Sequence, residues 1–113
     1  MSHPDIESVL PLTTTLFHML VSLADGPRHG YAIAGEVEEL SDGRIVMGPG
    51  TLYGSLQRMN RLGLVAETEN PGEEALHADR RRYYRITSLG REALRVESAR
   101  LLRAIDVARA RLG

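Results

Sequence analysis

Three segments, and the order in which they occur, restrict the fold of this chain most strongly. Residues 29–33 open one short helical pattern, residues 48–56 open a second, and an arginine- and tyrosine-rich run follows at residues 80–85. Two short helices followed by a basic hairpin are the parts of a winged helix-turn-helix, in which one helix enters a DNA groove and the hairpin lies beside it. The sequence therefore predicts a mostly α, α+β fold of this kind.

Size and composition limit the remaining classes. The chain has 113 residues, which suits a single domain, and its 42% hydrophobic and 26% charged residues are ordinary for a globular protein. The absence of cysteine excludes disulfides, thiolate metal ligands and thiol-based redox chemistry. No apolar run approaches the roughly 20 residues that cross a bilayer, and the N-terminus lacks the pattern of a signal peptide. These features predict a cytoplasmic protein without a membrane partner.

Charge is distributed unevenly along the chain. Residues 1–79 carry 12 acidic and 4 basic groups, a net charge of -8, whereas residues 80–113 carry 3 acidic and 10 basic groups, a net charge of +7. Binding to phosphate depends on where cations gather rather than on their sum, so the basic part favours a nucleic-acid partner. A solvated arginine face on a C-terminal helix explains the arginines from Arg91 onward equally well, but it explains the run at residues 80–82 less well.

A polar leader at residues 1–11 precedes the first expected helix, at residues 12–24. Apolar side chains recur there at helical spacing, and Pro11 is tolerated at a helix start because its missing N–H would be unpaired anyway. A second amphipathic helix is expected at residues 30–40. His29 is expected to cap it or to fix the preceding turn.

The third helix is expected to begin after Gly48-Pro49-Gly50 and to reach about Arg61. The apolar stretch at residues 44–47, which precedes it, is short enough to pair as a small strand. One side of the third helix is apolar and points to the core. The opposite side presents a polar reading face made of Tyr53, Gly54, Gln57, Arg58 and Arg61.

A wing is expected after the third helix. Gly63 closes the helix, and residues 64–69 read as a strand. A hairpin tip then begins at Asn70, and residues 81–86 return as the partner strand.

The C-terminal region reads as one long helix at residues 89–112, with Thr87 as a good N-cap. Its apolar stripe is too wide to be covered by so small a domain, so dimerisation is the natural way to bury it. The expected organisation is a DNA-binding domain at residues 12–86 and a dimerisation helix at residues 87–113. The residues expected at the dimer interface are Leu16, Phe17, Leu20, Leu94, Leu101, Leu102, Ile105 and Leu112.

Four segments, in order, resemble the PadR family of bacterial transcriptional regulators: Leu23 to Tyr31, Gly50 to Tyr53, Leu62 to Val65 and Arg82 to Thr87. The resemblance covers roughly residues 12–94. It implies a winged helix-turn-helix protein that binds operator DNA as a dimer, similar to a short subfamily with a single C-terminal dimer-forming helix. One departure is Gly54, where family members commonly have proline; the glycine costs about 1 kcal/mol of helix propensity relative to alanine.

The candidate DNA contacts begin at the third helix. Tyr53 projects from its first turn toward phosphate or base edges; the alternative is a half-buried aromatic between helix and wing. Thr51 either offers its hydroxyl and N–H to a phosphate or merely caps the helix. Gln57 suits adenine, and Arg58 or Arg61 suits guanine or the backbone. The full set is Tyr31, Gly50, Thr51, Tyr53, Gly54, Gln57, Arg58, Arg61, Arg80, Arg81, Arg82 and Tyr83.

The wing arginines, at residues 80–82, are placed to reach a minor groove or its phosphates. Acidic residues in the same hairpin are their alternative partners. Because side chains alternate along a strand, we expect Tyr84 and Ile86 to face inward and Tyr83 outward, although the opposite phase also fits the sequence. Tyr31 either contacts a phosphate or packs.

The predicted function is a dimeric DNA-binding regulator, in the simplest case a repressor of a pseudo-palindromic operator. The family resemblance implies that a small ligand can bind between the first and last helices of the dimer, where Leu16, Phe17 and Leu101 are candidate lining residues; a fully packed dimer core is the alternative. The histidines lack metal-binding spacing and no catalytic constellation is present, so no metal, cofactor or enzyme activity is expected. A winged-helix module that binds another protein remains the alternative function.

Overall fold

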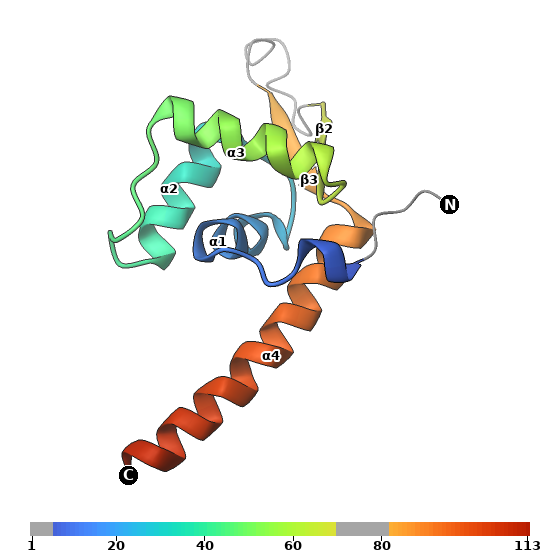
Figure 1. Ribbon diagram of the computed structural model, residues 1–113. Helices are drawn as coiled ribbons and strands as arrows, with labels where there is room; N and C mark the ends of the chain where they lie inside the picture. The colour runs from blue at the N-terminus through green and yellow to red at the C-terminus, as the bar shows by residue number, and fades with distance from the viewer. Residues whose placement is uncertain (1–5, 70–81) are drawn as a thin grey trace.

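The computed structural model describes residues 6–69 and 82–113 (Figure 1). In chain order the elements are the 3-10 helix η1 (Ile6–Val9), α1 (Thr14–Leu23), β1 (Arg28–His29), α2 (Gly30–Leu40), α3 (Pro49–Arg61), β2 (Val65–Thr68), β3 (Tyr83–Ile86) and α4 (Ser88–Leu112). The strands form one antiparallel sheet in the order β1-β3-β2. The fold is therefore the mostly helical winged helix-turn-helix that the sequence predicts.

The core lies where α1, α2, α3 and the sheet meet, because each helix turns its apolar stripe to this point. Met19, Leu20 and Ile33 have no exposed surface, and Leu16 is 6% exposed. The single chain therefore already covers Leu16 and Leu20. This burial corrects their assignment to a dimer interface, since neither has appreciable area left for a partner to cover.

The N-terminal segment differs from the polar leader expected of it. The 3-10 helix Ile6–Val9 packs against α4, and its apolar side chains lie partly buried against the core together with Leu10. Helix α1 begins at Thr14 rather than at residue 12. The cause is the hydroxyl of Thr13, which accepts a hydrogen bond from the Leu16 N–H at 3.1 Å and so caps the helix.

Helix α2 spans the predicted residues. Its start is fixed by His29, whose Nδ1 accepts a hydrogen bond from the Ala32 N–H at 3.3 Å, which confirms the predicted cap. Its end is followed by a tight turn at Asp42 and Gly43, which both have positive φ angles.

The stretch at residues 44–47 is a link and not a strand, which corrects that prediction. Its apolar side chains, Ile45 and Met47, lie partly buried against the core. The third strand is instead β1, which pairs with β3 through Arg28 opposite Tyr84. Since β1 and β2 flank β3 on both sides, the sheet has no free edge on β3 for residues 44–47 to join.

Gly63 closes α3 as predicted. Its N–H donates to the Asn60 carbonyl at 3.0 Å, and the Leu64 N–H donates to the Met59 carbonyl at 2.9 Å. Its φ of 81° lies in the left-handed region, which favours glycine at the end of a helix. The chain then enters β2 after a single turn.

The wing strands have the predicted facing. Tyr84 and Ile86 are buried and the intervening Arg85 is exposed, which confirms the inward phase of β3. Both strands are shorter than predicted, Val65–Thr68 and Tyr83–Ile86. The expected hairpin tip, with Arg80 and Arg81, lies outside the described residues.

Thr87 joins β3 to α4 and caps the helix, as predicted. Its hydroxyl donates to the Gly63 carbonyl at 2.6 Å and accepts from the Gly90 N–H at 3.0 Å. Glu97 is the last buried residue of the helix, and residues 99–113 are exposed throughout, so this half projects from the body (Figure 1). Neither α4 nor any other helix in the described part of the chain is long and apolar enough to cross a membrane.

Candidate nucleic-acid interface

The first turn of α3 presents backbone donors that no side chain caps. Gly48 is the N-cap and Pro49 occupies the first turn of the helix, without a capping side-chain hydrogen bond. Thr51 follows inside the helix and is exposed, so it is not the cap. Unpaired N–H groups and the positive end of the helix dipole make such a terminus favourable for phosphate.

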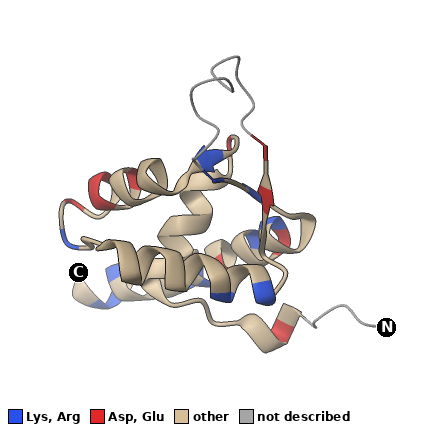
Figure 2. Cartoon of the chain, turned by 90° about the horizontal axis from the view of Figure 1, so that it is seen from above, with Lys and Arg blue, Asp and Glu red and all other residues tan. Residues whose placement is uncertain are grey.

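The outward face of α3 is polar and free of acidic residues. Gln57, Arg58 and Arg61 are exposed on it, while Leu52 and Leu56 are buried on the other side. Figure 2 views the molecule from above, where α3 has basic segments toward its C-terminal end and the acidic segments of α2 lie apart from them. This face can therefore approach a polyanion without repulsion from its own helix.

The Tyr53 ring packs over the backbone at the start of α2. A Cβ atom added to Gly30 would lie 2.6 Å from the Tyr53 hydroxyl oxygen, so the close approach requires glycine. The ring of Tyr31, which is 63% exposed, meets the Tyr53 ring edge to face with centroids 6.4 Å apart. Tyr53 is thus half-buried and its orientation is fixed by α2, while it remains at the polar face of α3.

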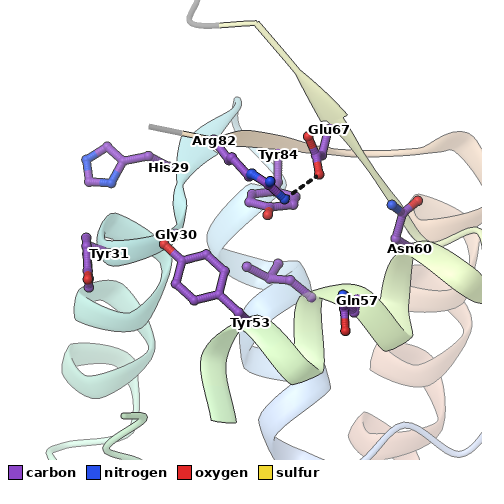
Figure 3. Close-up of a pocket in the computed structure, with 10 residues that line it drawn as sticks. His29, Gly30, Tyr31, Tyr53, Gln57, Asn60, Glu67, Arg82 and Tyr84 are labelled. Carbon is purple, nitrogen blue, oxygen red and sulfur yellow. Dashed lines mark hydrogen bonds and ion pairs between the residues drawn. The ribbon is translucent and has the colours of Figure 1, made fainter. Parts of the chain in front are cut away.

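A cavity of about 510 Å³ lies between α3, the start of α2 and the wing (Figure 3). It brings together four of the predicted DNA-binding residues from three segments: Tyr31, Tyr53, Gln57 and Arg82. The predicted residues Arg58 and Arg61 are not among its lining residues. The predicted contacts on α3 therefore lie in three places: at its start near Thr51, in the cavity, and toward its end at Arg58 and Arg61.

Sequence reasoning missed several residues of this cavity, among them Asn60, Glu67 and Tyr84. Tyr84 was expected to point inward, and the alternation of β3 carries that signal. Asn60 and Glu67 have no such signal, because nothing local to either residue indicates that α3 and β2 face the same space. Tyr83, predicted as a DNA contact, is partly exposed and packs edge to face on His29 with centroids 5.6 Å apart.

Glu67 and Arg82 form an ion pair across the wing, with Glu67 Oε2 3.4 Å from Arg82 Nη1. Tyr84 lines the same cavity as these two residues. Burial raises the pKa of the Tyr84 phenol, and the Glu67 carboxylate raises it further, while Arg82 acts in the opposite direction. The Tyr84 hydroxyl therefore keeps its proton at neutral pH.

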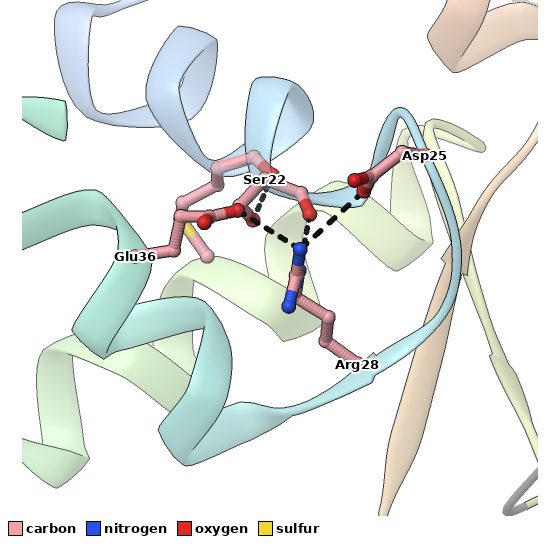
Figure 4. Close-up of polar contacts among 5 residues, drawn as sticks. Ser22, Asp25, Arg28 and Glu36 are labelled. Atoms are coloured by element: carbon pink, nitrogen blue, oxygen red, sulfur yellow. Dashed lines mark hydrogen bonds and ion pairs between the residues drawn. The ribbon is translucent and has the colours of Figure 1, made fainter. Parts of the chain in front are cut away.

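Arg28 fixes the start of α2 relative to α1 (Figure 4). Its Nε donates to the Ser22 carbonyl at 2.6 Å, and its Nη2 lies 3.4 Å from a carboxylate oxygen of Asp25 and 3.2 Å from one of Glu36. This guanidinium is thus engaged within the chain, where it ties the end of α1 and the α1–α2 turn to α2.

The second half of α4 leaves its apolar side chains uncovered in the single chain. Leu101, Leu102, Ile105 and Leu112 are between 37% and 85% exposed. Phe17 and Leu94, the other predicted interface residues, lie partly buried at the edge of the core. Among the residues that the structure describes, no group of three or more histidine or carboxylate side chains is arranged to hold a metal ion.

The chain matches the model of the transcriptional regulator PadR-like family over residues 19–96. It is also 41% identical over 85 residues to an uncharacterized 37.1 kDa protein in a transposon of Streptomyces fradiae. That match covers 75% of this chain but 22% of the relative, so the chain spans about a fifth of the length of that protein.

Solved structures share the fold. A transcriptional regulator from Clostridium thermocellum has a TM-score of 0.67 at 24% identity, with 97% of this chain and 96% of that chain covered. A PadR family transcription regulator from Clostridium difficile has a TM-score of 0.72 at 22% identity, with 89% and 100% covered. RosR from H. salinarum has a TM-score of 0.68 at 26% identity, with 85% and 79% covered.

Proposed function

Because the chain belongs to the PadR-like family of transcriptional regulators, we propose that it is a homodimeric repressor that binds a pseudo-palindromic operator in the cytoplasm. Family membership supports a DNA-binding regulator rather than an enzyme. In the proposed complex, α3 of each subunit enters one of two successive major grooves, about one helical turn apart. Binding there would occlude the promoter.

The acid-free, exposed face of α3 carries this proposal. At its start, the uncapped N–H groups near Gly50 and Thr51 suit a phosphate, and the neighbouring Gly54 leaves room for the backbone of DNA. Tyr53 and Gln57 stand next along the helix, where base edges are within reach in this class of protein. Arg58 and the C-terminal part of α3 would contact guanine or the sugar-phosphate backbone.

The wing would contact the adjacent minor groove or its phosphates. Arg82 stands at the start of β3 with its side chain 68% exposed, which supports this role. Arg80, Arg81 and Tyr83 complete the proposed wing contacts. The wing arginines would position the protein on the duplex rather than read its sequence.

The uncovered stripe of α4 supports a homodimer. Leu101, Leu102, Ile105 and Leu112 would pack against a second copy, with Phe17 and Leu94 at the edge of the contact. A small ligand held between α1 and α4 of the dimer, against Phe17 and Leu101, would change the spacing of the two reading helices and release the operator.

The test is fluorescence anisotropy with a duplex from the chain's own upstream region and a scrambled duplex, at physiological salt. We expect Kd values of about 10⁻⁸ M and about 10⁻⁵ M respectively. Gln57→Ala and Arg58→Ala should weaken operator binding by about 1–3 kcal/mol each. Arg95→Ala is the control, because Arg95 lies on α4 and pairs with Glu92. The proposal is contradicted if the protein binds both duplexes equally weakly and the two variants leave that binding unchanged. Such a result would favour a protein-binding module.

A further inference from the structure

Glu67 is the one acidic side chain among the described residues that line the cavity. The opposite wall is formed by α3, which has no acidic residue. Figure 3 shows the Arg82 side chain reaching past Tyr84 to the Glu67 carboxylate. An acid that lines the same cavity as proposed DNA contacts opposes that function electrostatically, so its presence there needs a physical reason.

A structural role does not supply that reason. The Glu67 and Arg82 side chains are 49% and 68% exposed, and exposed ion pairs contribute little to stability because water screens them. The strands are already held by backbone pairing along the whole of β2, from Val65 opposite Ile86 onward. A neutral glutamine would fill the same space on the strand.

The chemistry of the pair suggests another role. A guanidinium binds a carboxylate and a phosphate diester through the same N–H donors. The Glu67 carboxylate therefore occupies, in the free protein, donors that a DNA phosphate needs. A phosphate that approaches Arg82 meets repulsion from Glu67 until the two side chains separate.

We propose that Glu67 competes with a DNA phosphate for Arg82, so that the wing engages the backbone more readily where the α3 contacts hold the duplex close enough to displace the carboxylate. Glu67 is then a residue that sets the affinity of the regulator, although it makes no contact with DNA itself. The inference rests on the DNA-binding function proposed above and adds a determinant on β2 to it.

Glu67→Gln keeps the shape of the side chain and removes its charge. We expect this variant to bind the upstream duplex about three- to tenfold more tightly, because it removes the carboxylate that competes with the phosphate for Arg82. Arg82→Gln should bind more weakly, and the slope of log K against log salt concentration should become shallower by about 0.9, as expected for the loss of one phosphate contact.

A double-mutant cycle distinguishes competition from general repulsion. If Glu67 acts through Arg82, Glu67→Gln should change Kd by less than about twofold in the Arg82→Gln background. Glu92→Gln is the matched control, since Glu92 forms an exposed ion pair with Arg95 on α4 at 3.0 Å. It should leave Kd unchanged, and circular dichroism should show the same melting curve for all variants within a few degrees.

An equal gain from Glu67→Gln in both backgrounds would show that Glu67 acts on DNA directly and would overturn the proposal, as would no gain in either. Failure of the DNA-binding function looks different: the unmodified protein would show no preference for the upstream duplex, and Arg58→Ala would have no effect. That result would contradict both the DNA-binding function and the role of Glu67. Additive effects in the double-mutant cycle would contradict the role of Glu67 alone.

Discussion

The body of the chain buries its apolar side chains, whereas the second half of α4 leaves them exposed. In the body, Leu20 and Ile33 have no exposed surface. Beyond Glu97, Leu102 is 61% exposed and Leu112 is 85% exposed. Apolar side chains of similar amphipathic patterns are thus buried by the single chain in the body and exposed to solvent in the second half of α4. The stability of the body should therefore belong to the single chain, whereas the order of distal α4 should depend on protein concentration.

The largest expected effect is that of a cavity in the body. Leu20→Ala should lower the free energy of unfolding by about 2–5 kcal/mol, because Leu20 is fully buried. The matched control is Leu102→Ala, which makes the same change on the exposed half of α4. Urea denaturation in protein dilute enough to be monomeric should show the loss for Leu20→Ala and almost none for Leu102→Ala. Equal losses would mean that the two regions do not differ as described.

The next effect tests what covers α4. Ile105→Glu places a negative charge in the apolar stripe of α4. In a dimer joined through this stripe, the charge would be buried without a group of opposite charge beside it. We expect light scattering to show monomers. The affinity for the operator should fall by roughly 10- to 100-fold, because two separate subunits then bind the two half-sites independently. Ala110→Glu is the control, since residue 110 lies on the other side of the helix. A stable dimer of Ile105→Glu would place the subunit contact elsewhere.

The smallest effect concerns the contact between α2 and α3. Gly30→Ala should push the Tyr53 ring away and cost about 1–2 kcal/mol of stability, through overpacking. Near-ultraviolet circular dichroism reports the change, since the chain has four tyrosines and no tryptophan. Gly35→Ala makes the same change on α2 with nothing within 4 Å of the added carbon. It should instead stabilise by up to about 1 kcal/mol. The same response from both variants would exclude a role for the Tyr53 contact.

The elements predicted correctly are those whose signals are local. Helix α2 has its cap at His29 and loses its apolar period after Leu40, so its bounds are readable from eleven residues and their neighbours. In β3, alternation alone places Tyr84 and Ile86 inward. Gly63 similarly marks the end of α3, because few other residues adopt its backbone conformation.

The errors concern contacts between distant segments. Strand β1 has two residues, too few to show any period. The apolar face of α1 fits a core or a partner equally well, which is why Leu20 was assigned to the dimer although its own chain covers it. The cavity joins Tyr31, Asn60 and Glu67 from three separate segments, and only the packing of those segments brings them together. Helical and strand periods carry no information about that packing.

The junction at Thr87 has a mechanical consequence. A single residue separates β3 from α4, and its hydroxyl ties the helix start to the end of α3 through the Gly63 carbonyl. Helix α4, with 25 residues, is about 37 Å long. A tilt of about 5° at the junction would therefore displace its far end by roughly 3 Å. In a dimer joined through these far ends, each α4 would act as a rigid lever. A change in the angle between the two helices would then alter the distance between the two wings, while the fold of each subunit's body stays the same.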